Sequence, residues 1–267
     1  MRNQSNQWLI PVVLALGAAA ALWYYWTGIS APQPEPVAVP QPMTEEPAEL
    51  PEPLHPVDVT EDSATAGQEL VPLPPLDESD EYLKMAIADI FGGSIDDMLA
   101  ESGMIERVVA TIDSLPRSHV AERIRPINRL EGLFLVDGQD SSGEYSINIE
   151  NYRRYDALVG LATSADLAEV AELYRRFYPL FQGAYVDLGY PDGYFNDRLV
   201  EVIDDLLATP DSIDPIALVR PHVLYEYEDA ELEALSSGQK LMLRMGREHA
   251  ASIMVVLRDL RERITAL

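Results

Sequence analysis

The chain has 267 residues, with 45 acidic against 19 basic side chains and a formal net charge of -26 at pH 7. Nucleic acid is therefore excluded as an expected partner, because phosphate binding requires a basic surface. The chain has no cysteine, which excludes disulfides, zinc thiolate sites, iron–sulfur clusters and thiol catalysis. The length is enough for one large domain or two small ones.

Residues 8–26, WLIPVVLALGAAAALWYYW, contain no charged side chain. As a helix they would span roughly 28 Å, which matches the hydrocarbon core of a bilayer. Trp8 at one end and the aromatic residues 23–26 at the other suit the two membrane interfaces. The segment therefore predicts a single transmembrane helix, with the lipid bilayer as its partner.

The orientation of this helix follows from the distribution of positive charge. Arg2 and the amino terminus lie before the helix, and the next Lys or Arg after it is Lys84. The positive-inside rule then places residues 1–7 in the cytoplasm and exports the rest, as in a bacterial inner-membrane protein with a periplasmic domain. A cleaved signal peptide is the alternative, but bulky aromatic residues occupy the region where a signal peptidase requires small ones.

Residues 27–75 are rich in proline and carboxylates and contain no Lys or Arg. Such a composition buries too little apolar surface to offset the chain entropy, so we expect a disordered linker. Its extended length would approach about 150 Å, at about 3.1 Å per residue. In this interpretation His55 is a solvated side chain. The alternative is that the proline-rich stretch is itself a ligand for an aromatic groove.

Residues 76–267 are expected to form a globular, mainly helical domain. Ser79 is typical of an N-cap and Gly92 of a helix end, so the first helix is predicted between them. A second helix is expected to break or bend at Gly103 and to stop at Pro116. Further helices are predicted within three later stretches, at residues 192–210, 229–245 and 247–267.

In the middle of the domain, the spacing of the apolar residues changes from the helical period to the two-residue period of β-strands. Phe134 and Val136, a polar turn, and then alternating apolar residues up to Ile149 predict a β-hairpin. A third extended piece, residues 222–229, is expected either to join this sheet or to pair separately. The predicted fold class is therefore mainly α (α+β), a multi-helix domain with a small sheet.

The longest helical pattern surrounds the stretch YRRFYPLFQGAYVDLGYP, residues 174–191. Ser164 is the predicted N-cap and Gly189 the predicted end, while Pro179 predicts a kink or a break. The buried face is predicted from the helical period; it comprises Leu167, Val170, Tyr174, Phe177, Phe181, Ala184 and Leu188.

Cations that lie among aromatic residues are the candidate binding site of this acidic chain. Arginine offers a bidentate fork and tyrosine a flat wall, which together suit a carboxylate, a sugar or a peptide terminus. The alternative is that these arginines form ion pairs within the domain while the tyrosines pack inward. The candidate residues are Arg153, Arg154, Tyr155, Arg175, Tyr178, Gln182, Tyr185, Lys240 and Arg244.

No catalytic motif is present in the sequence, and no cofactor or metal is expected. The chain lacks the GxSxG and SxxK motifs and the glycine-rich phosphate loops. His119, His222 and His249 are scattered singly, without HExxH spacing. Paired carboxylates such as Asp204 and Asp205 are interpreted as a solvated helix face.

Several ordered motifs resemble the DUF3014 family, bacterial proteins of unknown function. They are PLPPLDESDEYL, VATIDSLPR, NYRRYDALV, RRFYPLFQGAYVDLGYP, FNDRLVEVIDDLLATP and GQKLMLRMG. The resemblance extends from about Leu73 to Leu260 and implies an inner-membrane protein with an exported domain. It supplies no catalytic residue, cofactor or substrate.

Three hypotheses about function remain open at this stage. The first is a non-enzymatic, membrane-anchored module that binds an envelope protein or a cell-wall component. The second is a periplasmic enzyme that acts on glycan or peptide, with Asp113 or Asp156 as acid or base. The third is a small-ligand sensor, although about seven cytoplasmic residues are too few to signal alone. The sequence does not indicate an oligomeric state.

Overall fold

The computed structural model describes residues 52–58, 72–130, 132–139 and 143–266. The chain divides into two compact units, Met1–Glu49 and Leu50–Leu267, and all described residues belong to the second. The expected transmembrane segment, residues 8–26, lies outside the described residues. None of the helices in the described part is both long and apolar enough to cross a membrane.

The domain begins with four helical elements, which are η2 (Leu76–Glu78), α2 (Asp80–Phe91), η3 (Gly93–Met98) and α3 (Met104–Ser114). The predicted end at Gly92 and the predicted break at Gly103 are confirmed, since both glycines have positive φ and Gly103 directly precedes α3. Ser79 occupies the predicted N-cap position of α2, but its side chain makes no capping hydrogen bond. The buried Ser79 hydroxyl donates to the carbonyl of Leu76 instead of accepting from α2.

The middle of the chain forms α4 (Glu150–Arg153), α5 (Asp156–Ser164) and α6 (Leu167–Asp187). Asp166 caps α6 by accepting from the N–H groups of Ala168 and Glu169, so the predicted cap at Ser164 is wrong. Pro179 does not break α6. Pro179 has no N–H to donate to the carbonyl of Arg175, one turn earlier. Because Pro179 is exposed, water can bond to that carbonyl instead.

The C-terminal part contains α7 (Phe195–Leu207), α8 (Ala230–Glu233), α9 (Ser237–Arg244) and α10 (Arg247–Ile264). A capping box between Ser236 and Gln239 starts α9. The predicted single helix over residues 229–245 is therefore two helices. Gly246, with φ of 85°, separates α9 from α10.

A four-stranded antiparallel sheet has the order β1 (Val136–Gln139), β2 (Glu144–Ile147), β3 (Ala217–Val219) and β4 (Glu226–Tyr227). The predicted hairpin is confirmed, with Val136 opposite Ile147. Ile149 is not in the strand, because it starts the turn into α4 and is 67% exposed. Of the third predicted extended piece, residues 222–229, only β4 forms a strand, and it joins the sheet by pairing with β3.

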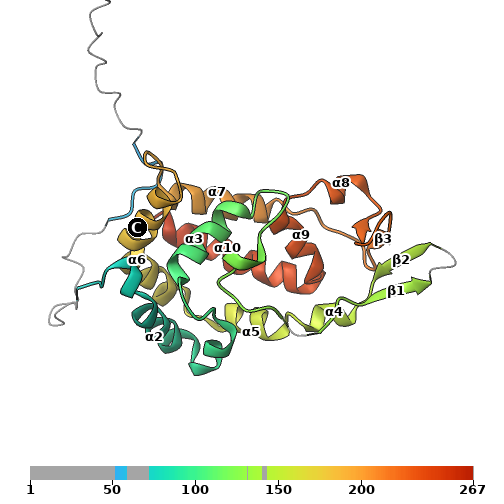
Figure 1. Ribbon diagram of the computed structural model, residues 1–267, viewed down its shortest axis with the longest axis horizontal. Coiled ribbons are helices and arrows are strands. Elements are labelled where there is room, and N and C mark those ends of the chain that lie inside the picture. The colour runs from blue at the N-terminus through green and yellow to red at the C-terminus, as the bar shows by residue number, and fades with distance from the viewer. Residues whose placement is uncertain (1–51, 59–71, 131, 140–142, 267) are drawn as a thin grey trace, which may run out of the picture. The chain divides into compact units, whose positions relative to one another are not determined.

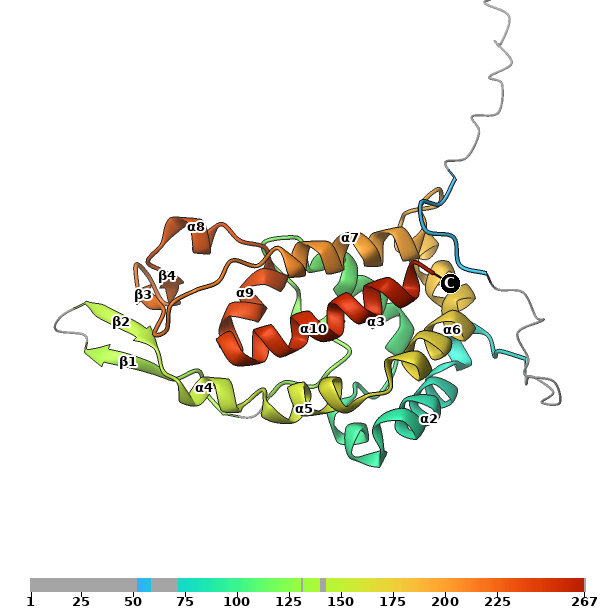
Figure 2. The same cartoon turned by 180° about the vertical axis from the view of Figure 1, so that it is seen from behind.

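Helices α3, α6, α7 and α10 pack against one another in both views, and the sheet lies beyond α4 (Figure 1, Figure 2). The largest core cluster lies between α2, α3 and α6 and includes Phe177, Phe181 and Phe195. The rings of Phe181 and Phe195 stack with centroids 5.6 Å apart. The fold is thus mainly helical with a small sheet, as the sequence predicts.

Residues 52–58, within the range expected to be a disordered linker, contact the domain. The backbone N–H groups of Leu54 and His55 donate to the carboxylate of Asp197 at the start of α7. Val57 packs against the largest core cluster. Both backbone polar groups of His55 are therefore hydrogen-bonded to the domain, and the residue is half-buried.

Candidate functional site

Four of the nine expected binding residues lie on α6; two of them are buried and the other two are half-buried. Tyr178 and Tyr185 are 9% and 6% exposed and belong to the largest core cluster. Gln182 accepts from the N–H of Phe195 and donates to the carbonyl of Gly193. The neighbouring face predicted for these side chains is thus part of the core, because the loop before α7 covers it. Leu188, expected to be buried, is 44% exposed.

The cations of this platform contact other parts of the domain. Arg175 pairs with Glu172 one turn earlier on α6, with Nη2 2.5 Å from Oε2. Arg153 pairs with Glu150 in the same way, at 2.9 Å. Arg154 donates to the carbonyls of Leu130 and Gly132 at 3.4 and 3.3 Å. These contacts match the alternative of intramolecular pairing.

The remaining candidates come together beside β4. Lys240 donates to the carboxylate of Glu233 and lies 6.0 Å from the ring centroid of Tyr227. Burial raises the pKa of Glu233, but hydrogen bonds from Lys240 and the Tyr227 N–H outweigh it, so the pKa lies below its usual value. Burial raises the pKa of Tyr155 and of Tyr227, while the charge of Arg244 lowers both in part. The structure therefore brings Tyr155, Lys240 and Arg244 to one region, apart from α6.

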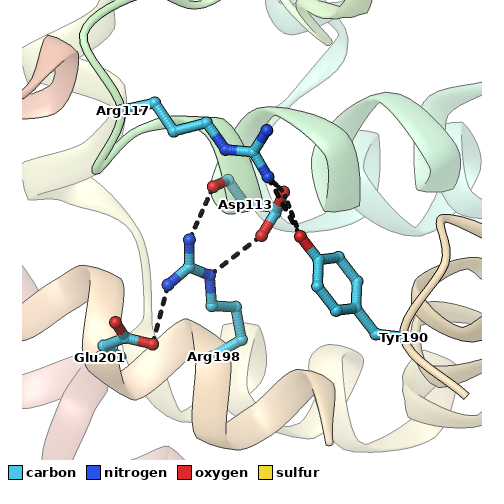
Figure 3. A network of polar contacts seen from close by, with 5 residues as sticks. All are labelled: Asp113, Arg117, Tyr190, Arg198 and Glu201. Atoms are coloured by element: carbon cyan, nitrogen blue, oxygen red, sulfur yellow. Dashed lines mark hydrogen bonds and ion pairs between the residues drawn. The ribbon is translucent and has the colours of Figure 1, made fainter. Parts of the chain in front are cut away.

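Asp113 is the centre of a polar network that joins α3, α7 and the loop between α6 and α7 (Figure 3). Its side chain is 5% exposed. Arg117 donates to Oδ2 at 2.5 Å, Arg198 donates to Oδ1 at 3.1 Å, and the Tyr190 hydroxyl lies 3.3 Å from Oδ2. Arg198 also donates to the backbone carbonyl of Asp113 at 2.8 Å and pairs with Glu201.

This arrangement gives Asp113 a structural role. Both carboxylate oxygens accept hydrogen bonds from arginine, so the side chain is fixed between α3 and α7. The Tyr190 ring stacks on Tyr185, with centroids 4.6 Å apart, and thereby connects the network to the core. A general base needs access to a substrate proton, whereas Asp113 is enclosed by side chains of the domain.

Asp156, the other carboxylate proposed from the sequence, is exposed and lies beside His249. Its Oδ1 is 3.1 Å from Nε2 of His249, whose Nδ1 is 3.0 Å from the carbonyl of Met245. This pair is the only one in which a described histidine and a carboxylate meet within ion-pair distance. Within the described ranges, no group of three or more His, Asp or Glu is placed to hold a metal ion.

An apolar pocket of about 290 Å³ opens between α5, α6, α10 and the η3 region. Every residue that lines it is apolar, and all but Leu99 are half-buried, so the walls remain partly accessible. None of the predicted site residues lines it. The lining residues are Phe91, Ile95, Met98, Leu99, Ile127, Leu158, Leu161, Ala162, Ala165, Leu167, Val170, Val256 and Leu260.

The chemistry of this pocket is that of hydrophobic binding alone. It offers no side-chain acid, base or nucleophile, and its volume is near the lower end of ligand pockets. Burying one Leu or Phe side chain in it would contribute about 1.5–3 kcal/mol. Sequence reasoning missed the pocket because its residues come from five helical elements and from loops, and each of these helices has an ordinary apolar face.

Comparison with known proteins gives one match. The model of a family described as a protein of unknown function, DUF3014, matches residues 104–261. This range includes α3, the sheet and all helices from α4 to α9, together with most of α10. No curated protein and no solved structure matches the chain.

Proposed function

This chain belongs to the DUF3014 family, and we propose that it is a non-catalytic interaction module, anchored in the inner membrane, whose periplasmic domain binds another protein of the cell envelope. The apolar pocket between α5, α6 and α10 is the observation that carries this proposal. A partner would insert one or two apolar side chains there, as an anchor residue does at a protein interface.

The pocket also favours a protein over a cell-wall polysaccharide. Sugar rings carry many hydroxyl groups, and each would lose hydrogen bonds to water in a pocket whose lining offers none in return. Leucine or phenylalanine side chains have no such cost. A protein partner is therefore the better fit to the described surface.

Membrane attachment is the second part of the proposal. Residues 8–26 have the length and the flanking aromatic residues of a transmembrane helix, and the residues up to 51 read as a tether. Protease added to spheroplasts should degrade the domain if it is exported. Complete protection of residues 76–267 would contradict this orientation.

Two observations weigh against the alternative of an enzyme. Asp113 is held by two arginines and a tyrosine, and Asp156 is paired with His249 at the surface. Neither carboxylate lines the apolar pocket. A substitution of Asp156 with Asn should accordingly leave the phenotype of the cells unchanged.

The test of pocket binding is site-specific photocrosslinking in cells that produce the full chain. We would place a photoreactive phenylalanine at Leu161, which lines the pocket, and expect one discrete crosslinked protein. The matched control is the same residue at Ala157, which is exposed on the same helix and outside the pocket. It should give less than about a tenth of that product.

A second variant makes the experiment specific for apolar burial. Leu158→Glu places a charge in the pocket, and Ala157→Glu places the same charge on the exposed face of α5. Only the first should abolish the crosslink from position 161, with thermal melting used to check that both variants fold. Equal crosslinking in both variants would contradict a partner seated in the pocket.

A further inference from the structure

Residues Pro53–Val57 meet the start of α7 through their backbone. The N–H of Leu54 lies 2.9 Å from Oδ2 of Asp197, and the N–H of His55 lies 2.7 Å from Oδ1. The amide of Asn196 donates to the carbonyl of His55 at 2.9 Å. Two consecutive donors and one acceptor of the segment are thus satisfied by two neighbouring side chains.

The receiving side chains are held in place before the segment arrives. Asn196 is fully buried, and its amide also donates to the carbonyl of Ile264 at 3.1 Å. Its Oδ1 accepts from the hydroxyl of Tyr174 at 3.0 Å. Because its two other side-chain contacts come from the folded domain, Asn196 presents one N–H in a fixed direction, which lowers the entropic cost of binding.

The sequence of the segment matches this site in a specific way. In PLHP, residues 53–56, the two prolines lack N–H groups, so Leu54 and His55 provide the only donors. Both donors are directed at the single carboxylate of Asp197. Each proline also restricts the residue before it to an extended conformation, so less freedom is lost on docking.

Apolar contact completes the attachment. Val57 packs against the core cluster of α2, α3 and α6, whereas the Leu54 side chain is 81% exposed. The segment therefore has a backbone clamp at residues 54–55 and one side-chain anchor two residues later. In Figure 2 this segment, drawn in blue, runs beside the start of α7 and the end of α10.

We propose that Asn196 and Asp197 form a peptide-docking site at the start of α7, which holds the chain's own segment Pro53–Val57 in cis. The ligand class is a peptide that bends at two adjacent N–H donors between prolines, followed by a small apolar side chain. This site is separate from the apolar pocket and does not depend on the function proposed for it.

Hydrogen–deuterium exchange on the full chain in detergent micelles tests the docking. The amides of Leu54 and His55 should exchange at least about tenfold more slowly than in Asp197→Ala, which removes both acceptor oxygens. The matched control is Asp187→Ala, which removes an exposed acid of α6 and should keep the protection. Equal exchange in the wild type and Asp197→Ala would overturn the proposal.

Substitutions in the segment itself avoid any effect on the fold of α7. Leu54→Pro removes one of the two donors and should increase exchange at His55, whereas Glu52→Pro removes an N–H that bonds to no other described residue. Protection at His55 that survives Leu54→Pro unchanged would contradict a shared clamp. Protection that rises with protein concentration would show docking on a second copy and overturn the assignment in cis.

Discussion

Arg198 of α7 contacts Asp113 of α3 twice, with Nε 3.1 Å from Oδ1 and Nη2 2.8 Å from the backbone carbonyl oxygen. The two helices are thus joined by a charged side chain that is 17% exposed and a carboxylate that is 5% exposed. Asp113→Asn keeps the shape but removes the charge that two arginines share. We expect a loss of about 3 kcal/mol in the free energy of unfolding, measured by chemical denaturation.

The control for this substitution lies in the same network. Glu201→Gln removes the charge at its exposed end, where the carboxylate is 64% exposed, and should cost less than about 1 kcal/mol. A loss for Asp113→Asn as small as that for Glu201→Gln would contradict the structural role of the network.

Gly246 is required by both its backbone and its surroundings. Its φ is 85° and its ψ is 158°, and an added Cβ would lie 2.6 Å from Cγ of Tyr152. Gly246→Ala should therefore lower the free energy of unfolding by at least about 2 kcal/mol, because this backbone region, which is essentially restricted to glycine, alone costs about 1–3 kcal/mol. Thermal melting or chemical denaturation would measure this loss.

The same substitution, glycine to alanine, should stabilise the domain at Gly160. It lies inside α5, and an added Cβ would meet no atom within 4 Å. Gly160→Ala should raise the free energy of unfolding by about 0.5–1 kcal/mol, since alanine favours the helix. Stabilisation by both substitutions would show that the turn between α9 and α10 differs from the one described.

Buried tyrosines predict alkaline unfolding. Burial raises the pKa of Tyr178 to about 12, and it also raises the pKa of Tyr174 and Tyr227. Because folding raises these pKa values, burial of the neutral tyrosines is compatible with the folded state below pH 10. As the pH rises from 10 toward 12, ionisation favours the unfolded chain, and the free energy of unfolding falls. Each such tyrosine should steepen this loss by up to about 1.4 kcal/mol per pH unit.

Absorbance at 295 nm, recorded with far-UV circular dichroism, measures this behaviour. The buried tyrosines should ionise together with the loss of helix, and Tyr178→Phe should make the decline of stability above pH 10 less steep. Tyr82, which is 43% exposed, provides the control substitution Tyr82→Phe. Complete ionisation of all tyrosines near pH 10 without loss of helix would contradict their burial.

The pair formed by Asp204 and Arg261 predicts a small acid-sensitive contribution. Two hydrogen bonds from Arg261, at 2.6 and 2.9 Å, hold the pKa of Asp204 below its usual value of 3.8. The stabilisation is therefore present above about pH 4 and disappears as the pH falls below it. Since the carboxylate is 49% exposed, Asp204→Asn should cost only about 0.5–1 kcal/mol at pH 7.

The comparison across pH distinguishes the ion pair from other effects of this substitution. The difference between Asp204→Asn and the wild type should vanish near pH 2, when the carboxylate is protonated. Asp89→Asn, at an exposed position that forms no ion pair with another described residue, should show no difference at either pH. A constant difference for Asp204→Asn would assign its cost to something other than charge.

Local signals in the sequence determined much of the fold. Glycines at 92 and 103 mark helix ends because their positive φ is costly for other residues, and alternation around residue 147 marks the hairpin. Strand β3 could not be recognised, because three residues are too few for a period. Its pairing with β2 joins residues about 70 positions apart in the chain.

The candidate site was harder to predict than the fold. A helical wheel places Tyr178 and Tyr185 beside the apolar face, but only the loop before α7 decides that they are buried. The structural role of Asp113 could not be predicted, because its arginine partner on α7 follows 85 residues later. The docking of residues 53–57 depends on the side chain of Asp197, so no local pattern reveals it.

Docking at residue 53 changes the distance over which the domain can search for a partner. In the anchored arrangement proposed above, 26 residues rather than 49 would separate the membrane helix from the first point of attachment. At about 3.1 Å per residue the maximal reach falls from about 150 Å to about 80 Å. For a flexible tether the effective concentration of the domain near a membrane-bound partner would rise about 2.5-fold. Release of this short segment would extend the search radius without any change in the folded domain.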